Sequence, residues 1–174
     1  MTKDDTPDYS VDRLSEAIGI LTRRETEARI LIPLIRDLGE AFGRAAVIET
    51  VSRTIINIAE AQGRELARLM GGNTAEDFKN ALAFWTKDDA LEIEMKESSA
   101  HTLCFNVTRC RYAEMYKALG ASDLGAVFSC NRDAALIRGF NPGATMERNK
   151  TIMEGHPVCD FRYVFPEDQE QDPR

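Results

Sequence analysis

Cysteine is the residue type with the widest chemical range in this sequence, and the chain has four of them, Cys104, Cys110, Cys130 and Cys159. A free thiol acts as a nucleophile, as a metal ligand or as a small buried hydrophobe. Cys130 and Cys159 are the candidate catalytic thiols, because a thiolate can attack an electrophilic carbon and a second thiol can protonate a leaving group. The alternative that both fill the core stays open, because free cysteine is among the most buried residue types.

Two acidic residues follow cysteines at helical spacing. Asp133 lies three residues after Cys130 and Glu114 lies four residues after Cys110, so on a helix each carboxylate would share a face with a thiol. Such a carboxylate can serve as a general base or as the partner of a cationic substrate group. Asp133 is equally compatible with the N-cap position of a helix. Glu114 is equally compatible with an exposed position on a surface helix. Both alternatives to a catalytic role stay open.

Basic side chains are the candidates for holding an acidic substrate. In the strand-like segment CDFRY, Cys159 and Phe161 face one way and Arg162 faces the other, so Arg162 is expected on the far face in an ion pair. A substrate carboxylate beside Cys159 would then need one of three other guanidinium groups, those of Arg111, Arg132 or Arg148.

The remaining titratable residues divide between the two halves of the chain. His156 precedes Pro157 in a turn, where it can shuttle protons near neutral pH or simply be exposed. The charged residues of the N-terminal half are interpreted as solvated helix faces and are not site candidates; they include Arg23, Arg24, Glu25 and Glu27.

The C-terminal segments resemble the L-2-amino-thiazoline-4-carboxylic acid hydrolase family over residues 107–163. The shared pattern is a Cys followed within a turn by Tyr and Glu, then Leu-Gly, a second Cys with Asp three residues on, Asn-Pro, Thr-Ile, and a Gly before Cys-Asp-Phe. The matching residues are Cys110, Tyr112, Glu114, Leu119, Gly120, Cys130, Asp133, Asn141, Pro142, Thr151, Ile152, Gly155, Cys159, Asp160 and Phe161.

The resemblance implies a hydrolase that opens the ring of 2-amino-thiazoline-4-carboxylate with water and yields a carbamoyl cysteine. This chemistry needs a nucleophile at the amidine carbon, an acid group for the nitrogen and a cation for the carboxylate. The expected catalytic residues are Cys130, Cys159, Asp133 and Glu114. The expected substrate-binding residues are Cys110, Tyr112, Asn141, Arg148 and His156. No cofactor and no metal is expected.

The alternative from another class is a non-enzymatic small-molecule or zinc-binding module of the sensor type. Thiolates and imidazole are good zinc ligands, but structural sites usually draw them in close pairs, and the close pair here is His156 with Cys159. The segment HPVCDFRY is also faintly similar to the end of 4-vinyl reductase-type sensor domains. The spacing therefore favours the hydrolase over the zinc module.

Helical periodicity dominates the N-terminal half, which must position these groups. Apolar residues recur at three- and four-residue steps over 11–43 and 45–70, which predicts long helices with a break near Thr22 and a kink at Pro33. Asn73 and Thr74 are typical of a cap for a short helix that runs to about Trp85. Further helices are predicted over 112–119 and 124–137.

Alternation of apolar and polar residues begins after Lys87 and predicts strands near 90–97, 102–108, 144–153 and 158–165. Cys104 falls opposite Leu103, Phe105 and Val107 in this alternation and is not a site candidate. The expected fold class is α+β, with an N-terminal helical half followed by a small antiparallel sheet with intervening helices.

The whole chain has 174 residues, 43% of them hydrophobic and 29% charged, which indicates one globular domain over 11–165. The tails at 1–10 and 166–174, the latter acidic, are expected to be disordered. A net charge of −7 argues against nucleic acid and against an anionic membrane surface as partners. A small-molecule substrate is therefore the expected partner.

The compartment and the assembly follow from the same composition. The first ten residues lack a signal-peptide pattern, and no apolar run approaches the roughly 20 residues of a membrane helix, so we expect a cytoplasmic protein with all cysteines reduced. The N-terminal helices carry more apolar surface than a small sheet can cover. A homo-oligomer formed through those helices is therefore expected.

Overall fold

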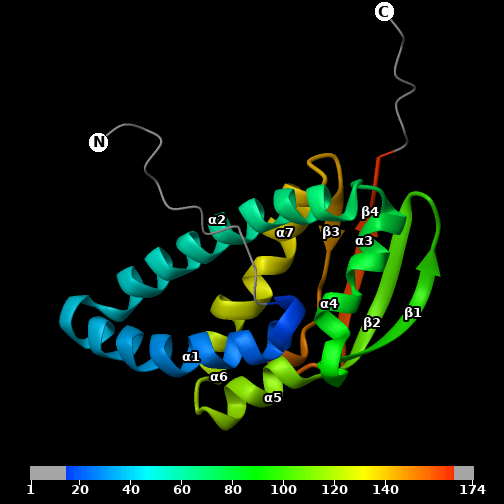
Figure 1. The fold of residues 1–174 in the computed structure, drawn as a ribbon. Helices are drawn as coiled ribbons and strands as arrows, with labels where there is room; N and C mark the ends of the chain where they lie inside the picture. The colour runs from blue at the N-terminus through cyan, green and yellow to red at the C-terminus, as the bar shows by residue number, and fades with distance from the viewer. Residues whose placement is uncertain (1–14, 167–174) are drawn as a thin grey trace, which may run out of the picture.

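Two long helices begin the described part of the chain, residues 15–166 of the computed structural model (Figure 1). They are α1 (Ser15–Phe42) and α2 (Arg44–Met70), and they fold back on each other as a hairpin. Gly43 joins them with a φ of 91°, a left-handed conformation that glycine adopts without strain. The predicted long helices are thus present and form one edge of the molecule.

A pair of short helices, α3 (Ala75–Ala81) and α4 (Ala83–Thr86), leads into the sheet through the single turn η1 (Lys87–Asp89). Thr74 caps α3, as its sequence predicts. The Thr74 hydroxyl accepts the backbone N–H of Asp77 at 3.2 Å, and the Asp77 carboxylate accepts the backbone N–H of Thr74 at 3.0 Å. This reciprocal pair fixes where α3 begins.

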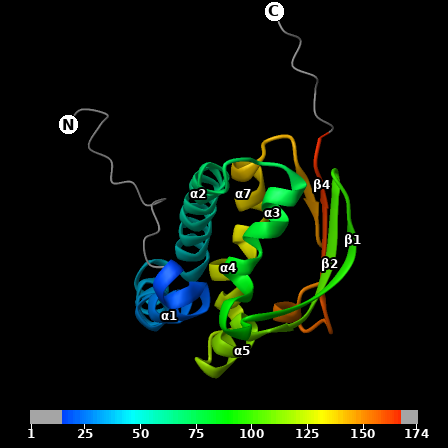
Figure 2. The same cartoon turned by 45° about the vertical axis from the view of Figure 1, so that its right-hand side comes forward.

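An antiparallel sheet follows in the order β1-β2-β4-β3. Its strands are β1 (Leu91–Ser98), β2 (Thr102–Cys110), β3 (Thr145–Glu147) and β4 (Cys159–Val164). Leu103, Phe105 and Val107 of β2 are buried and Cys104 between them is less so, as the alternation predicts. The labelled helices all lie on one side of the sheet (Figure 2). The fold is α+β, with the helical half first.

The segment between β2 and β3 is again helical, and its last helix packs across α2. It consists of α5 (Arg111–Ala118), α6 (Ser122–Gly125), the π-helical segment η2 (Ala126–Cys130) and α7 (Asn131–Phe140). Gly139 of α7 and Gly63 of α2 lie where the two helix backbones meet. A Cβ atom at either position would overlap a backbone carbonyl oxygen of the facing helix, so this crossing requires glycine.

The predicted helix break near Thr22 is wrong. The interruption in α1 lies at Gly19, whose φ of 72° and ψ of 158° are not helical, and the helix continues through Thr22 to Phe42. Pro33 stays within the helix on its exposed side. Burial of Ile32 and Ile35 beside it offsets the hydrogen bond that proline removes. The part of the expected helix before residue 15 lies outside the described residues.

The predicted strand over 144–153 is also wrong beyond Glu147. The backbone N–H groups of Asn149 and Lys150 donate to the Asp160 carboxylate at 3.0 Å and 2.6 Å instead of to a neighbouring strand. The chain then forms the single turn η3 (Ile152–Glu154), which Thr151 caps by accepting the Glu154 N–H at 3.1 Å. The predicted helix over 124–137 is similarly divided, because η2 interrupts it before α7.

Three clusters make up the core of the described residues, and the smallest of them packs Ile20, Ala90 and Tyr112. The other two are larger. One packs Phe78, Phe105, Phe140 and Tyr163 between α3, α7 and the sheet, and the other joins α1 and α2 to α5 and η2. Within residues 15–166, no helix combines the length and the apolar character that crossing a membrane demands. The expected tail at 1–10, and the expected tail at 166–174 apart from its first residue, lie outside the described residues.

Candidate functional site

A cavity of about 370 Å³ lies between the helices and the inner face of the sheet. Most of its wall is apolar and aromatic, from α2, α3, α4, β1 and β2, including Leu66, Phe78, Phe84, Trp85, Leu91 and Phe105. Its polar wall comes from α1, η2, α7 and the segment before η3, with Arg23, Arg24, Cys130, Arg132, Asp133 and Arg148. A concave apolar site with a few convergent polar groups is the usual form of a small-molecule pocket.

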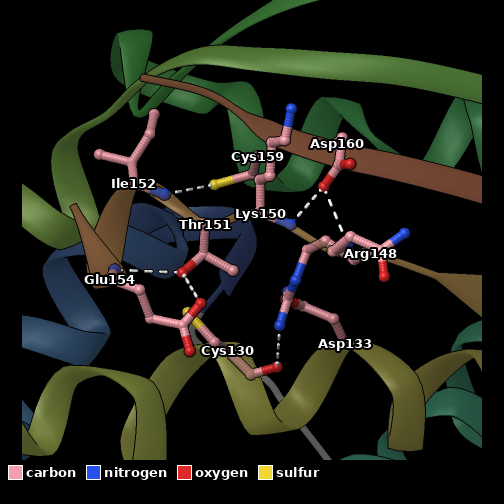
Figure 3. Close-up of polar contacts among 10 residues, drawn as sticks. Cys130, Asp133, Arg148, Lys150, Thr151, Ile152, Glu154, Cys159 and Asp160 are labelled. Atoms are coloured by element: carbon pink, nitrogen blue, oxygen red, sulfur yellow. Dashed lines mark hydrogen bonds and ion pairs between the residues drawn. The ribbon is translucent and has the colours of Figure 1, made fainter. Parts of the chain in front are cut away.

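Three of the four cysteines line this cavity. Cys110 ends β2, Cys130 ends the π-helical segment and Cys159 begins β4, so the fold brings together thiols that are distant in sequence. Figure 3 shows Cys159 on its strand and Cys130 on the helical segment facing it. Cys104 is not part of this wall. All four cysteines are free.

The cavity thiols are held in their protonated form. Burial raises the pKa of Cys110 to about 11, and it raises the pKa of Cys130 further still. Burial also raises the pKa of Cys159, although its sulfur accepts the Ile152 N–H at 3.2 Å, which acts in the opposite direction. At neutral pH these groups are therefore thiols and weak nucleophiles.

Asp133 and Arg148 form the central polar pair. The Arg148 guanidinium donates to the Asp133 carboxylate and to the Cys130 carbonyl oxygen, the latter at 3.3 Å (Figure 3). Its Cζ atom lies 5.2 Å from the centre of the Phe161 ring. Asp133 is the third residue of α7 and is not the N-cap that its sequence also allowed. Arg148 is therefore held by three contacts, with Asp133, Cys130 and Phe161.

Burial sets the protonation of this pair. It raises the pKa of Asp133 to about 6, against the lowering effect of the Arg148 charge. Burial also disfavours the charge on Arg148, but the Asp133 carboxylate keeps the Arg148 pKa above its ordinary value. Asp133 can consequently gain and lose a proton near neutral pH, which is the property of a general acid–base group.

The interpretation of Arg23 and Arg24 as solvated residues is wrong. Their side chains are 13% and 6% exposed, and both line the cavity. The sequence does contain a signal, because Arg24 lies four residues after Ile20 and four before Ala28, which are both buried. A charged residue inside an apolar helix stripe indicates a buried charge. Glu25, at 41% exposed, is solvated as expected.

Arg132 joins these two arginines from α7, and Glu27 lies among them. The Glu27 carboxylate is 2.8 Å from Arg24, 3.6 Å from Arg23 and 4.0 Å from Arg132. Burial lowers the pKa of Arg132 to about 9 and that of Arg23 to about 10, and the neighbouring Arg24 charge acts in the same direction. Arg23, Arg24 and Arg132 are called the arginine cluster below.

Three expected site residues lie away from the cavity. Glu114 forms an exposed ion pair with Arg109 at 2.8 Å. His156 is exposed in its turn. Asn141 is buried and bonds the Asn73 carbonyl oxygen at 2.9 Å, so it ties the end of α7 to the start of α3.

The other expected residues are distributed around the site. Tyr112 does line the cavity, and its hydroxyl donates to the Trp85 carbonyl oxygen at 3.4 Å. Arg111 lies in a separate surface hollow. Arg162 points to the opposite face of β4 from Cys159, as expected, where it donates to the Phe105 carbonyl oxygen and the Asn106 side chain rather than forming the expected ion pair.

A metal site is not formed by the described side chains. Within residues 18–166, no three or more histidine, cysteine, aspartate or glutamate side chains are grouped so that they could hold a metal ion. Cys110, Cys130 and Cys159 share the cavity wall without forming a ligand set.

The chain is an α+β domain whose cavity is largely apolar and has charged side chains along one part of its wall. The chain belongs to the L-2-amino-thiazoline-4-carboxylic acid hydrolase family, whose family model matches residues 23–163. The match includes the N-terminal helices with Arg23 and Arg24, as well as the C-terminal pattern seen in the sequence. No curated protein is a significant match to the chain.

Solved structures add a relationship of fold. The phenol-responsive sensory domain of the transcription activator PoxR, solved with phenol, has a TM-score of 0.53 and 10% identity, over 87% of this chain and 78% of that one. A mutant Fe(II) unliganded H-NOX protein from K. algicida has a TM-score of 0.41 and 10% identity, over 92% and 95% of the two chains. At this identity the first likeness concerns the fold alone, and the second is too low to support an argument.

Proposed function

We propose that the chain is a hydrolase that opens the ring of a small cyclic amidine-like acid, with 2-amino-thiazoline-4-carboxylate as the substrate that its family indicates and a carbamoyl cysteine as the product. The observation that carries the proposal is the Asp133 carboxylate, oriented by Arg148 inside a ligand-sized cavity. Family membership supplies the reaction class. The geometry supplies a group that can perform it.

Asp133 serves as the general base in this proposal. Its pKa of about 6 leaves it mostly ionised at neutral pH, yet close enough to neutrality to accept a proton from water. The ion pair with Arg148 fixes the direction of the carboxylate, so that the water it activates can be positioned against a bound ring.

The attacking group is then water and not a thiolate. Cys110, Cys130 and Cys159 all have raised pKa values, so forming a thiolate in the cavity costs more than it does in water. Their place in the proposal is in the wall, where they exclude bulk water and contact the ring. Glu114 lies outside the cavity and has no part in the chemistry.

The proposed steps balance with water as the co-substrate. Asp133 accepts one proton as the water oxygen bonds to the amidine carbon, and this proton passes to the ring nitrogen. The remaining hydroxyl proton of the adduct moves to the sulfur as the carbon–sulfur bond breaks. The product carries a carbamoyl group and a free thiol, and Asp133 is again ionised.

The test is turnover by the Asp133→Asn variant. Asparagine keeps the size of the side chain but cannot accept the proton, so we expect a loss of at least about 1,000-fold in kcat, on the order of 4 kcal/mol in barrier. The rates are measured below the melting temperature of the variant, which should fall because the buried Arg148 loses its charged partner. The matched control is Asp123→Asn, because Asp123 pairs with Arg44 on the surface. Equal loss in both variants, or no turnover by the parent protein, contradicts the proposal.

A second candidate function is binding of an apolar small molecule without turnover. The aromatic wall of the cavity, formed by Phe78, Phe84 and Trp85, favours it, because a small polar acid leaves this surface uncovered. Calorimetry with phenol and with the thiazoline acid separates the two candidates. Tight phenol binding with no hydrolysis of the acid supports the sensor-like function, and hydrolysis of the acid supports the enzyme.

A further inference from the structure

The arginine cluster places several cations around one acidic side chain at the cavity wall. Arg24 and Arg132 both approach the same Glu27 oxygen, at 2.8 Å and 4.0 Å, from helices that are distant in sequence. One carboxylate carries a single negative charge, so it cannot neutralise two buried guanidinium groups. The incomplete compensation agrees with the lowered pKa of Arg132.

We propose that the arginine cluster is the subsite that binds the carboxylate of the substrate, with Arg24 and Arg132 as its principal donors. This inference rests on the proposed function and specifies how the substrate lies in the same cavity. Arginine presents a planar fork of donors that matches a carboxylate, and a buried arginine loses little further hydration when a ligand binds.

Arg148 is assigned to the base rather than to the substrate carboxylate, on account of its contacts. Its guanidinium already donates hydrogen bonds to the Asp133 carboxylate and the Cys130 carbonyl oxygen. A substrate carboxylate bound there would compete with the base for its orienting partner. Arg24 and Arg132 have no such conflict, since their hydrogen bonds go to Glu27, to the Phe128 carbonyl oxygen and to Gln62.

The cluster is close enough to Asp133 for one small ligand to reach both. The charges of Arg132 and Arg24 act on Asp133, where they oppose the rise of its pKa. Arg132 directly precedes Asp133 on α7, and Arg24, Arg132 and Asp133 all line the same cavity. A ring acid held by its carboxylate at the cluster therefore presents its amidine carbon toward the base.

A purely structural role does not account for the arrangement. Arg132 also donates to the Phe128 carbonyl oxygen at 2.8 Å and to the Gln62 side chain at 3.3 Å, which neutral residues could accomplish without burying another charge. Burying like charges together costs stability. A site that binds an anion explains why this cost is tolerated.

The experiment compares the acid with 2-amino-thiazoline, which lacks the carboxylate, in the parent protein and in Arg24→Met and Arg132→Met variants. We expect KM for the acid to rise roughly 10- to 100-fold in each variant. Turnover of the analogue without the carboxylate should stay within a few-fold of the parent, and the melting temperature should stay equal or rise, since the remaining arginines still pair with Glu27. Arg24→Lys should recover part of the affinity for the acid.

The matched control is Arg29→Met, on the same helix. Arg29 pairs with Glu25 at 2.5 Å but is 62% exposed, so its removal should leave KM for both compounds unchanged. Equal losses for the acid and for the analogue without the carboxylate, or a lower melting temperature with unchanged KM, would overturn the subsite.

Binding measurements separate this inference from the proposed function. If the parent protein binds the acid by calorimetry without hydrolysing it, and Arg24→Met and Arg132→Met lose that binding, then the subsite stands and the proposed hydrolysis fails. If the parent protein binds neither compound, the subsite is overturned together with the proposed function.

Discussion

At the scale of single residues, Asp133 is central to the proposed function. Burial raises its pKa and the Arg148 charge lowers it. Its pKa of about 6 has a direct consequence for the pH profile. The base must be ionised to accept a proton, so kcat/KM should fall as pH drops through about 6 and level off above it. Initial rates between pH 5 and 8 measure this. A profile without a break near 6 would contradict the role of Asp133 as base.

The cysteines give a second prediction at this scale. Since burial raises the pKa values of Cys110, Cys130 and Cys159, alkylation by iodoacetamide at pH 7.5 should be much slower in the native protein than after unfolding. Thiol titration of the unfolded protein without reductant should find all four thiols.

The same reasoning predicts how the thiols affect turnover. Cys130→Ser and Cys159→Ser should each lose less than about 10-fold in kcat, because neither thiol attacks the substrate. A loss of about 1,000-fold in either variant, with an unchanged melting temperature, would instead identify that thiol as the nucleophile.

The sequence predicts only part of the site at residue resolution. The spacing of Cys130 and Asp133 and the alternation around Cys159 indicate residues that the structure does bring together at the cavity. Glu114 lies outside the cavity because the side of α5 that carries it faces Arg109. The local sequence does not specify which side of a short helix faces a cavity. Sequence reasoning misses Arg23 and Arg24 because a charged residue is usually solvated, and because Arg132, which completes their cluster around Glu27, comes from α7.

At the scale of elements, the crossing of α2 and α7 determines where the site residues lie. Gly139→Ala should destabilise the protein by roughly 1–3 kcal/mol, because the added methyl group overlaps the Glu60 carbonyl oxygen and forces the helices apart. Gly39→Ala is the control, since its Cβ meets only ordinary contacts at 3.4 Å or more within a helix. Chemical denaturation measures both. Equal stabilities would mean that the crossing adapts without cost.

Elements were predictable where a local pattern determines them. The period-two alternation of β2 and the capping box at Thr74 are local, and both predictions hold. The end of β3 is different, because the Asp160 carboxylate from another strand takes the N–H groups of Asn149 and Lys150. A contact between residues distant in sequence leaves no local pattern.

At the scale of the whole molecule, the long helical hairpin exposes apolar side chains that the sheet cannot cover. Along α1 these recur at multiples of four residues, with Ile30 68%, Leu34 48% and Phe42 72% exposed. Burial of apolar area is the principal force in association, and a net charge of −7 opposes contact over the charged faces. We therefore expect the homo-oligomer interface to contain these side chains.

Sedimentation at micromolar concentration tests this assembly. The parent protein should sediment as an oligomer, and Leu34→Glu should dissociate it while leaving the melting temperature of the subunit nearly unchanged, because Leu34 contributes little to the subunit core. The control is Val164→Glu, since Val164 is comparably exposed at 55% but lies on the sheet. Turnover should persist in the Leu34→Glu monomer, because residues of a single chain line the cavity. A parent protein that sediments as a monomer would show that the exposed stripe of α1 is simply solvated.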